Sequence, residues 1–175
     1  MNFEFSPVQF GSLLLITGIC FVVLWYMDHK THLAIWKKDI TDGELRTHRM
    51  ILYSSYGLLA GLVLLAVSPI VALPLCIGCF ISRLTHEFID ELHWHLPRCT
   101  ERETLIHLGM WVSVQTGTFT LFVWGFAYQY QGFLELPWPF YVGFAAVAGA
   151  MGWIGHHEIF DYMDKPREIN ATEHA

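Results

Sequence analysis

Histidine is the residue type in this chain that points most clearly to chemistry. Nine of the ten histidines lie near the ends of apolar segments, and carboxylates accompany them in the stretches HEFIDELHWH (86–95) and HHEIFDY (156–162). Imidazole and carboxylate groups together suit iron, zinc, manganese or copper. The clustering therefore predicts a site for transition-metal ions.

Helical spacing would place several of these groups on common faces, since residues three, four or seven apart share a face of an α-helix. His86, Asp90 and His93 form such a stripe within one segment. The full set of predicted metal ligands is His29, His32, His48, His86, Asp90, His93, His107, His156, His157 and Asp161. Because this set exceeds the needs of one ion, two metal ions are expected, with iron favoured and zinc or copper as alternatives.

Three glutamates beside the predicted ligands are candidate catalytic residues. Glu87 would bridge the metals or orient their ligands, whereas Glu91 and Glu158 would move protons. Two histidines are predicted to stay outside the site. His95 precedes Leu96-Pro97 and is expected in a loop, because a proline disfavours helix at the residue before it. His174 is expected in the C-terminal tail.

The elements that must position these residues are predicted from composition. Hydrophobic residues make up 54% of the chain and charged residues only 15%. This composition is more apolar than a soluble protein needs. Apolar segments suited to crossing a membrane as helices cover residues 10–26, 51–67, a stretch that ends near 89, 105–128 and 140–154, the last continuing to about 160. The prediction is an all-α integral membrane protein, with residues 1–175 forming one bundle of about five transmembrane helices.

Basic residues predict the orientation of this bundle, because short loops rich in Lys and Arg stay in the cytoplasm. All ten fall on one side of the predicted segments: Lys30, Lys37, Lys38, Arg46, Arg49, Arg83, Arg98, Arg102, Lys165 and Arg167. The N-terminus is therefore expected outside and the C-terminus inside, with the histidines at the cytoplasmic face. A formal charge of -6 argues against nucleic acid as a partner.

The histidines and cysteines each have an alternative, purely structural role. Histidine is amphipathic and can sit at a membrane interface without binding metal, although interfacial anchors would occur at both faces and these histidines occupy one. Cys76 and Cys79 have the C-x-x-C spacing of a redox pair, yet cysteine is also common as a small apolar residue inside helices.

The pairs His29-x-x-His32 and His156-His157 resemble those of the membrane histidine-box di-iron family, which includes fatty-acid desaturases, hydroxylases and alkane monooxygenases. The resemblance is confined to these sites and concerns their chemistry. It implies histidines at the cytoplasmic ends of transmembrane helices that hold two irons and activate oxygen.

Three functions are compatible with these observations. The first is a non-haem, di-metal oxidoreductase of a lipid or other apolar substrate, which would need an electron-donor protein because no nicotinamide, flavin or phosphate-loop motif is present. The second is a zinc-dependent membrane hydrolase. The third is a small, non-catalytic subunit of a respiratory or photosynthetic complex that ligates haem or chlorophyll; haem is less favoured because carboxylates surround the candidate ligands.

Overall fold

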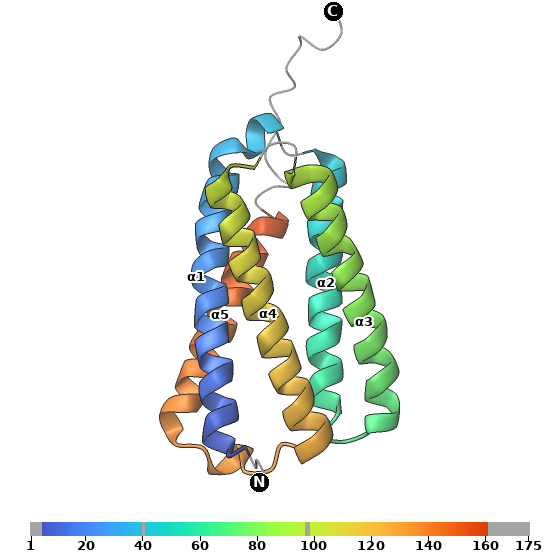
Figure 1. Ribbon diagram of the computed structural model, residues 1–175, viewed down its shortest axis with the longest axis vertical. Coiled ribbons are helices and arrows are strands. Elements are labelled where there is room, and N and C mark those ends of the chain that lie inside the picture. Colours follow the sequence, from blue (N-terminus) through green and yellow to red (C-terminus); the bar gives the residue numbers. More distant parts are fainter. Residues whose placement is uncertain (1–4, 40, 97–98, 161–175) are drawn as a thin grey trace, which may run out of the picture.

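The protein is a bundle of five long helices (Figure 1). The computed structural model describes residues 5–39, 41–96 and 99–160, without the side chains of residues 32–39 and 159–160. The helices are α1 (Pro7–Asp39), α2 (Asp42–Leu64), α3 (Pro69–Ile89), α4 (Glu101–Tyr128) and α5 (Trp138–Phe160), with a π-helical turn η1 (Asp90–His95) and a 3₁₀ turn η2 (Phe133–Glu135). Strands are absent from the described residues, which confirms the predicted all-α fold.

Local sequence signals explain where the helices begin. Thr41 caps α2 by accepting a hydrogen bond from the Glu44 backbone nitrogen at 3.2 Å. Thr100 and Glu103 cap α4 reciprocally, the Glu103 carboxylate accepting from the Thr100 backbone nitrogen at 2.7 Å. Pro69 occupies the start of α3, where its missing N–H costs nothing.

Two helices run well past their predicted apolar segments. α1 continues to Asp39 and α2 begins at Asp42, whereas the apolar segments end at residue 26 and begin at residue 51. Hydropathy marks only the apolar length of a helix, so it misses these polar extensions. They matter because they carry much of the candidate site.

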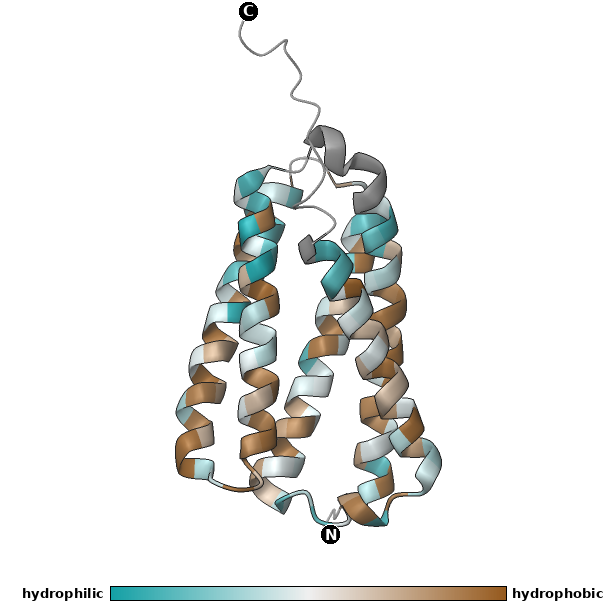
Figure 2. Cartoon of the chain, turned by 180° about the vertical axis from the view of Figure 1, so that it is seen from behind, coloured by the Kyte–Doolittle hydropathy of each residue, from teal (hydrophilic) through white to brown (hydrophobic). Residues whose placement is uncertain are grey.

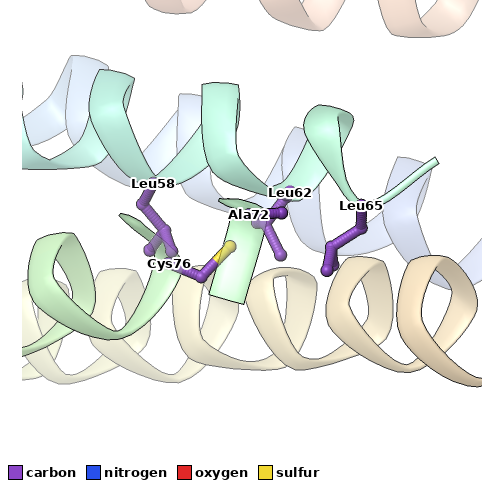
Figure 3. Packing of buried hydrophobic residues seen from close by; sticks show 5 residues of the cluster. All are labelled: Leu58, Leu62, Leu65, Ala72 and Cys76. Carbon is purple, nitrogen blue, oxygen red and sulfur yellow. The ribbon is translucent and has the colours of Figure 1, made fainter. Parts of the chain in front are cut away.

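α2 packs closely against α3, as Figure 3 shows from nearby. Leu58 and Leu62 of α2 meet Ala72 and Cys76 of α3 in a buried apolar cluster. The close approach depends on Gly61, where an added Cβ would lie 2.8 Å from the Cys76 sulfur. Cys76 and Cys79 are free thiols, and they fill the space opposite Gly61 and Gly57.

α1 packs against α4 and α5 on the other side of the bundle. Phe10 stacks on the buried Trp124 ring with centroids 5.2 Å apart, and Leu136 joins their cluster. Tyr130, in the turn after α4, donates a hydrogen bond from its hydroxyl to the Leu62 carbonyl oxygen at 2.7 Å. The two sides of the bundle are thus tied together at the end away from the histidines.

Two helical stretches, Pro7–Thr31 and Pro69–His95, are long and apolar enough to cross a membrane. A buried helix of a soluble protein can pass the same test of length and composition. Hydrophobic residues dominate most of the bundle's length, while hydrophilic residues gather at the end where α2 and α4 begin (Figure 2). The bundle therefore has one polar end, and the candidate site lies in it.

Candidate metal centre

Four of the five helices, α1, α2, α4 and α5, send ionisable side chains into the polar end of the bundle, and so does the π-helical turn η1. The groups that meet there, hereafter the polar cluster, are Asp28 and His29 of α1, Glu44 and His48 of α2, Asp90, Glu91 and His95 of η1, His107 of α4, and Glu158 of α5. Each of these side chains is buried or half-buried. Such groups need charge compensation, which here comes from one another or from bound cations.

His107 connects α1 to η1 through both of its ring nitrogens. Its Nε2 lies 2.9 Å from Oδ1 of Asp28, and its Nδ1 lies 2.9 Å from Oε2 of Glu91. A carboxylate only accepts hydrogen bonds, so a ring that bonds to two carboxylates donates from both nitrogens and is an imidazolium. In the metal-free chain, His107 therefore neutralises part of the acidic charge around it.

His95 lies at the centre of the polar cluster and is only 2% exposed. Its Nε2 is 3.5 Å from a Glu44 carboxylate oxygen, and its Nδ1 is 3.6 Å from Asp90. Its ring centroid is 4.4 Å from that of His107 and 6.0 Å from that of His48. The expectation that His95 is a loop residue outside the site is wrong.

The π-helical turn explains this outcome. In η1 the Leu96 backbone nitrogen donates to the Glu91 carbonyl oxygen at 2.8 Å, which is the five-residue spacing of a π-helix. The wider turn brings His95 onto the face that carries Asp90 and leaves His93 exposed. The predicted stripe of His86, Asp90 and His93 assumed α-helical spacing, which ends at Ile89.

His48 pairs with Asp90, its Nε2 lying 3.0 Å from a carboxylate oxygen. Burial alone lowers the pKa of His48, but the charge of Asp90, its hydrogen bond and the nearby Glu158 and Glu44 carboxylates together raise this pKa to about 10. His48 therefore carries a proton at neutral pH in the metal-free chain. A metal ion bound by this nitrogen would release that proton.

Two groups of side chains in the polar end could each hold a metal ion. Glu44, His48 and His95 form one, and His95, Cys99 and His107 form the other, with the ligand atoms of each group within 4.8 Å of one another. His95 belongs to both groups and offers two ring nitrogens. His95 could therefore serve as a ligand in either group, and the imidazole, carboxylate and thiol side chains of the two groups suit transition-metal ions.

Sequence reasoning missed Glu44 and Cys99 as well as His95. Glu44 stands in the first turn of α2, where an acidic residue commonly faces solvent and favours the helix dipole, yet here it is 0% exposed. Its position four residues before His48 is the signal that could have identified it. Cys99 lies four residues after His95, and its backbone nitrogen donates to the His95 carbonyl oxygen at 2.8 Å.

On the α5 side, Glu158 accepts a hydrogen bond from Nε1 of Trp25 at 2.9 Å and lies 3.8 Å from Nδ1 of His29. His157 is half-buried with its ring centroid 4.6 Å from that of Trp153, whereas His156 is exposed. Neither His156 nor His157 is in the two groups at ligand distance. The side chain of His32 and all of Asp161 lie outside the described residues.

Two further predicted site residues have partners elsewhere. Nδ1 of His86 lies 2.7 Å from the Ser82 carbonyl oxygen of its own helix. Glu87 accepts a hydrogen bond from the buried Arg83 at 2.8 Å and another from Gln115 at 3.2 Å. Glu87 is thus held in an ion pair one turn away from the polar cluster.

Comparison with known protein families, with curated proteins and with solved structures gives no match for this chain.

Proposed function

We propose that this chain is a multi-pass membrane protein that holds two divalent transition-metal ions in its polar cluster. With them it acts as a non-haem oxidoreductase on a lipid or other apolar substrate at the cytoplasmic face. The observation that carries the proposal is the convergence of imidazole and carboxylate groups from α1, α2, η1, α4 and α5, including two groups at ligand distance that share His95.

Exposed apolar side chains support five membrane crossings rather than two. Each helix presents large apolar residues that are about half exposed or more: Ile16 and Ile19 on α1, Leu59 and Val63 on α2, Ile77 and Ile81 on α3, Leu108 and Phe119 on α4, and Val142 and Trp153 on α5. A soluble protein rarely exposes apolar surface on this scale, because it would aggregate. Lipid around the whole bundle would account for all five faces. The one-sided distribution of Lys and Arg favours a cytoplasmic position for the polar cluster.

Charge balance supports two divalent ions. The polar cluster contains five carboxyl groups, those of Asp28, Glu44, Asp90, Glu91 and Glu158, within a buried or half-buried space. Cys99 would bind metal as a thiolate and add a sixth negative charge. Two divalent ions supply four positive charges, and two retained protons complete the balance. Imidazolium ions could compensate the same carboxylates without metal, so metal content is the property that separates the two possibilities.

The nitrogen and oxygen ligands of Glu44, His48 and His95 favour iron over a softer metal, and bound iron would supply oxygen activation. The chain's own side chains would orient the metal ligands and move protons. When one ring nitrogen of His107 binds the metal, the other can still donate to Asp28 or Glu91, and that carboxylate would orient the ring as carboxylates commonly do for metal-bound imidazoles. Glu158, held by Trp25 at the edge of the polar cluster, is placed to hold or pass a proton. Electrons would come from a partner protein.

Cys99 favours a second candidate, a zinc-dependent membrane hydrolase. His95, Cys99 and His107 offer two imidazoles and a thiol. Three protein ligands with an open fourth position are typical of catalytic zinc, which activates a bound water. A haem site is less compatible, because a haem pocket has little use for so many carboxylates beside its axial histidines.

Elemental analysis and an absorption spectrum of the protein purified without chelators test these alternatives. About two irons per chain without a Soret band would support the proposed oxidoreductase. One zinc alone would support the hydrolase, and a Soret band would support haem. A protein free of metal would leave the polar cluster as a network of imidazolium and carboxylate ions, and the proposal would fail.

A further inference from the structure

A pocket of about 260 Å³ lies between α2 and the end of α3, outside the polar cluster. It is lined by Gly43, Arg46, Thr47, Met50, His86 and Ile89. His86 belongs to the stripe that its sequence spacing predicts to bind metal, and the structure puts it in this pocket. His86 therefore faces a pocket outside the proposed metal site, and the residues around it indicate a ligand other than a metal ion.

The polar side of the pocket suits an anion. Arg46 is exposed and brings a permanent positive charge. The carbonyl of Ser82 accepts from Nδ1 of His86 at 2.7 Å, which fixes the imidazole ring against α3. Among the described residues that line the pocket there is no carboxylate, so none of them opposes the charge of Arg46.

The other side of the pocket is apolar. Met50 and Ile89 are 37% and 41% exposed, and Tyr53 and Phe88 continue the exposed apolar surface along the two helices. Trp94 lies beside the pocket and donates from Nε1 to the Thr47 hydroxyl at 3.3 Å. Its ring needs the space left by Gly43, since a Cβ there would lie 2.8 Å from the ring. Tryptophan with one polar contact and an apolar body is typical of the membrane–water interface.

The pocket thus joins an anion-binding side to an apolar side at the level where the hydrophilic end of α2 and α3 gives way to their apolar length (Figure 2). We infer that it binds the headgroup of an anionic phospholipid, with the phosphate held by Arg46 on the polar side of the pocket and the acyl chains lying over Met50 and Ile89. The inference rests on the proposed membrane location and is independent of the metal.

Native mass spectrometry of the purified full-length protein, with equal amounts of phosphatidylglycerol and phosphatidylcholine, tests the inference. The expected result is retention of phosphatidylglycerol in preference to phosphatidylcholine. Arg46→Gln should weaken retention of phosphatidylglycerol about fivefold, since a basic residue near a membrane surface contributes on the order of 1 kcal/mol to binding anionic lipid. Arg102→Gln is the matched control, because Arg102 is another exposed arginine at the same end of the bundle.

A second variant tests whether lipid binding depends on the pocket itself or only on the positive charge of Arg46. Met50→Trp keeps Arg46 but fills the pocket, and its exposed position makes the larger side chain tolerable. This variant should lose phosphatidylglycerol as Arg46→Gln does. Equal losses in Arg46→Gln and Arg102→Gln, full retention by Met50→Trp, or no preference for phosphatidylglycerol would overturn the inference. Metal content, measured on the same samples, reports separately on the polar cluster.

Discussion

Asp90 and His95 stand five residues apart, and their side chains face each other across the π-helical turn, with Nδ1 of His95 3.6 Å from the Asp90 carboxylate. An α-helix would have put residues 93 or 94 opposite Asp90 instead. A single widened turn therefore decides which histidine enters the polar cluster. π-helical turns are rare and occur frequently at functional sites, which agrees with the proposed role of this one.

Replacing His95 by Ala should remove most of the bound metal, because His95 belongs to both groups at ligand distance. Loss of a ligand or of its supporting partner typically costs about ten- to a hundredfold in metal affinity. His93→Ala is the matched control, since His93 is exposed on the same turn. Metal per chain, measured by elemental analysis, should fall only in the first variant. Equal metal content in both variants would show that His95 is not a ligand.

Removing the metal with a chelator should lower the thermal stability of the protein. A ligand present at a hundredfold excess over its Kd stabilises the folded state by about 2.7 kcal/mol. Tm in detergent should fall on chelation and recover when the metal is returned. The Tm of the His95→Ala variant should change little in either step. A wild-type Tm that does not change when the chelator is added would contradict a bound metal ion.

Gly61→Ala should be less stable than Gly78→Ala by about 1–3 kcal/mol, the usual cost of overpacking. An added Cβ at Gly61 would lie 2.8 Å from the Cys76 sulfur and 3.2 Å from its backbone nitrogen, whereas Gly78 has nothing within 4 Å. Both changes gain the same helix propensity, so their difference in free energy of unfolding reports packing alone. Equal Tm values would mean that α2 and α3 are less closely packed than the structure shows.

The proposed topology can be tested by cysteine labelling in a background whose four native cysteines are replaced by alanine. Leu134 is 87% exposed in η2, and Asp42 is exposed at the start of α2, at the other end of the bundle. Leu134→Cys should react with an impermeant thiol reagent from outside intact cells. Asp42→Cys should react only after the membrane is opened. The reverse order of reaction would invert the orientation.

The five helices could be predicted because long apolar runs are a strong signal. The prediction placed the end of the third segment near residue 89, and α3 ends at Ile89. The polar extensions of α1 and α2 could not be predicted in this way. Their residues are hydrophilic, and caps such as Thr41 mark a helix start only weakly without an apolar segment beside them.

The candidate site was predicted in its chemistry and in its place at the helix ends, but only partly in its membership. His29, His48, Asp90 and His107 lie in the polar cluster as expected from their positions. His95 could not be assigned, because nothing in HEFIDELHWH distinguishes a π-turn from an α-turn. Glu44 was missed because burial of a first-turn acid depends on tertiary contacts that the sequence does not display.

The contact between Asp28 and His107 has a consequence for how the protein is made. Their side chains are 79 residues apart in sequence, so in the proposed five-crossing topology α1 would enter the membrane before α4 has been synthesised. Helices that insert one after another associate only once they are in place, and the polar cluster needs α4 docked between α1 and η1. A nascent chain that has inserted only its first three helices lacks His107. Uptake of any ion that requires the whole cluster therefore belongs to the last stage of biogenesis, after the final helices have docked.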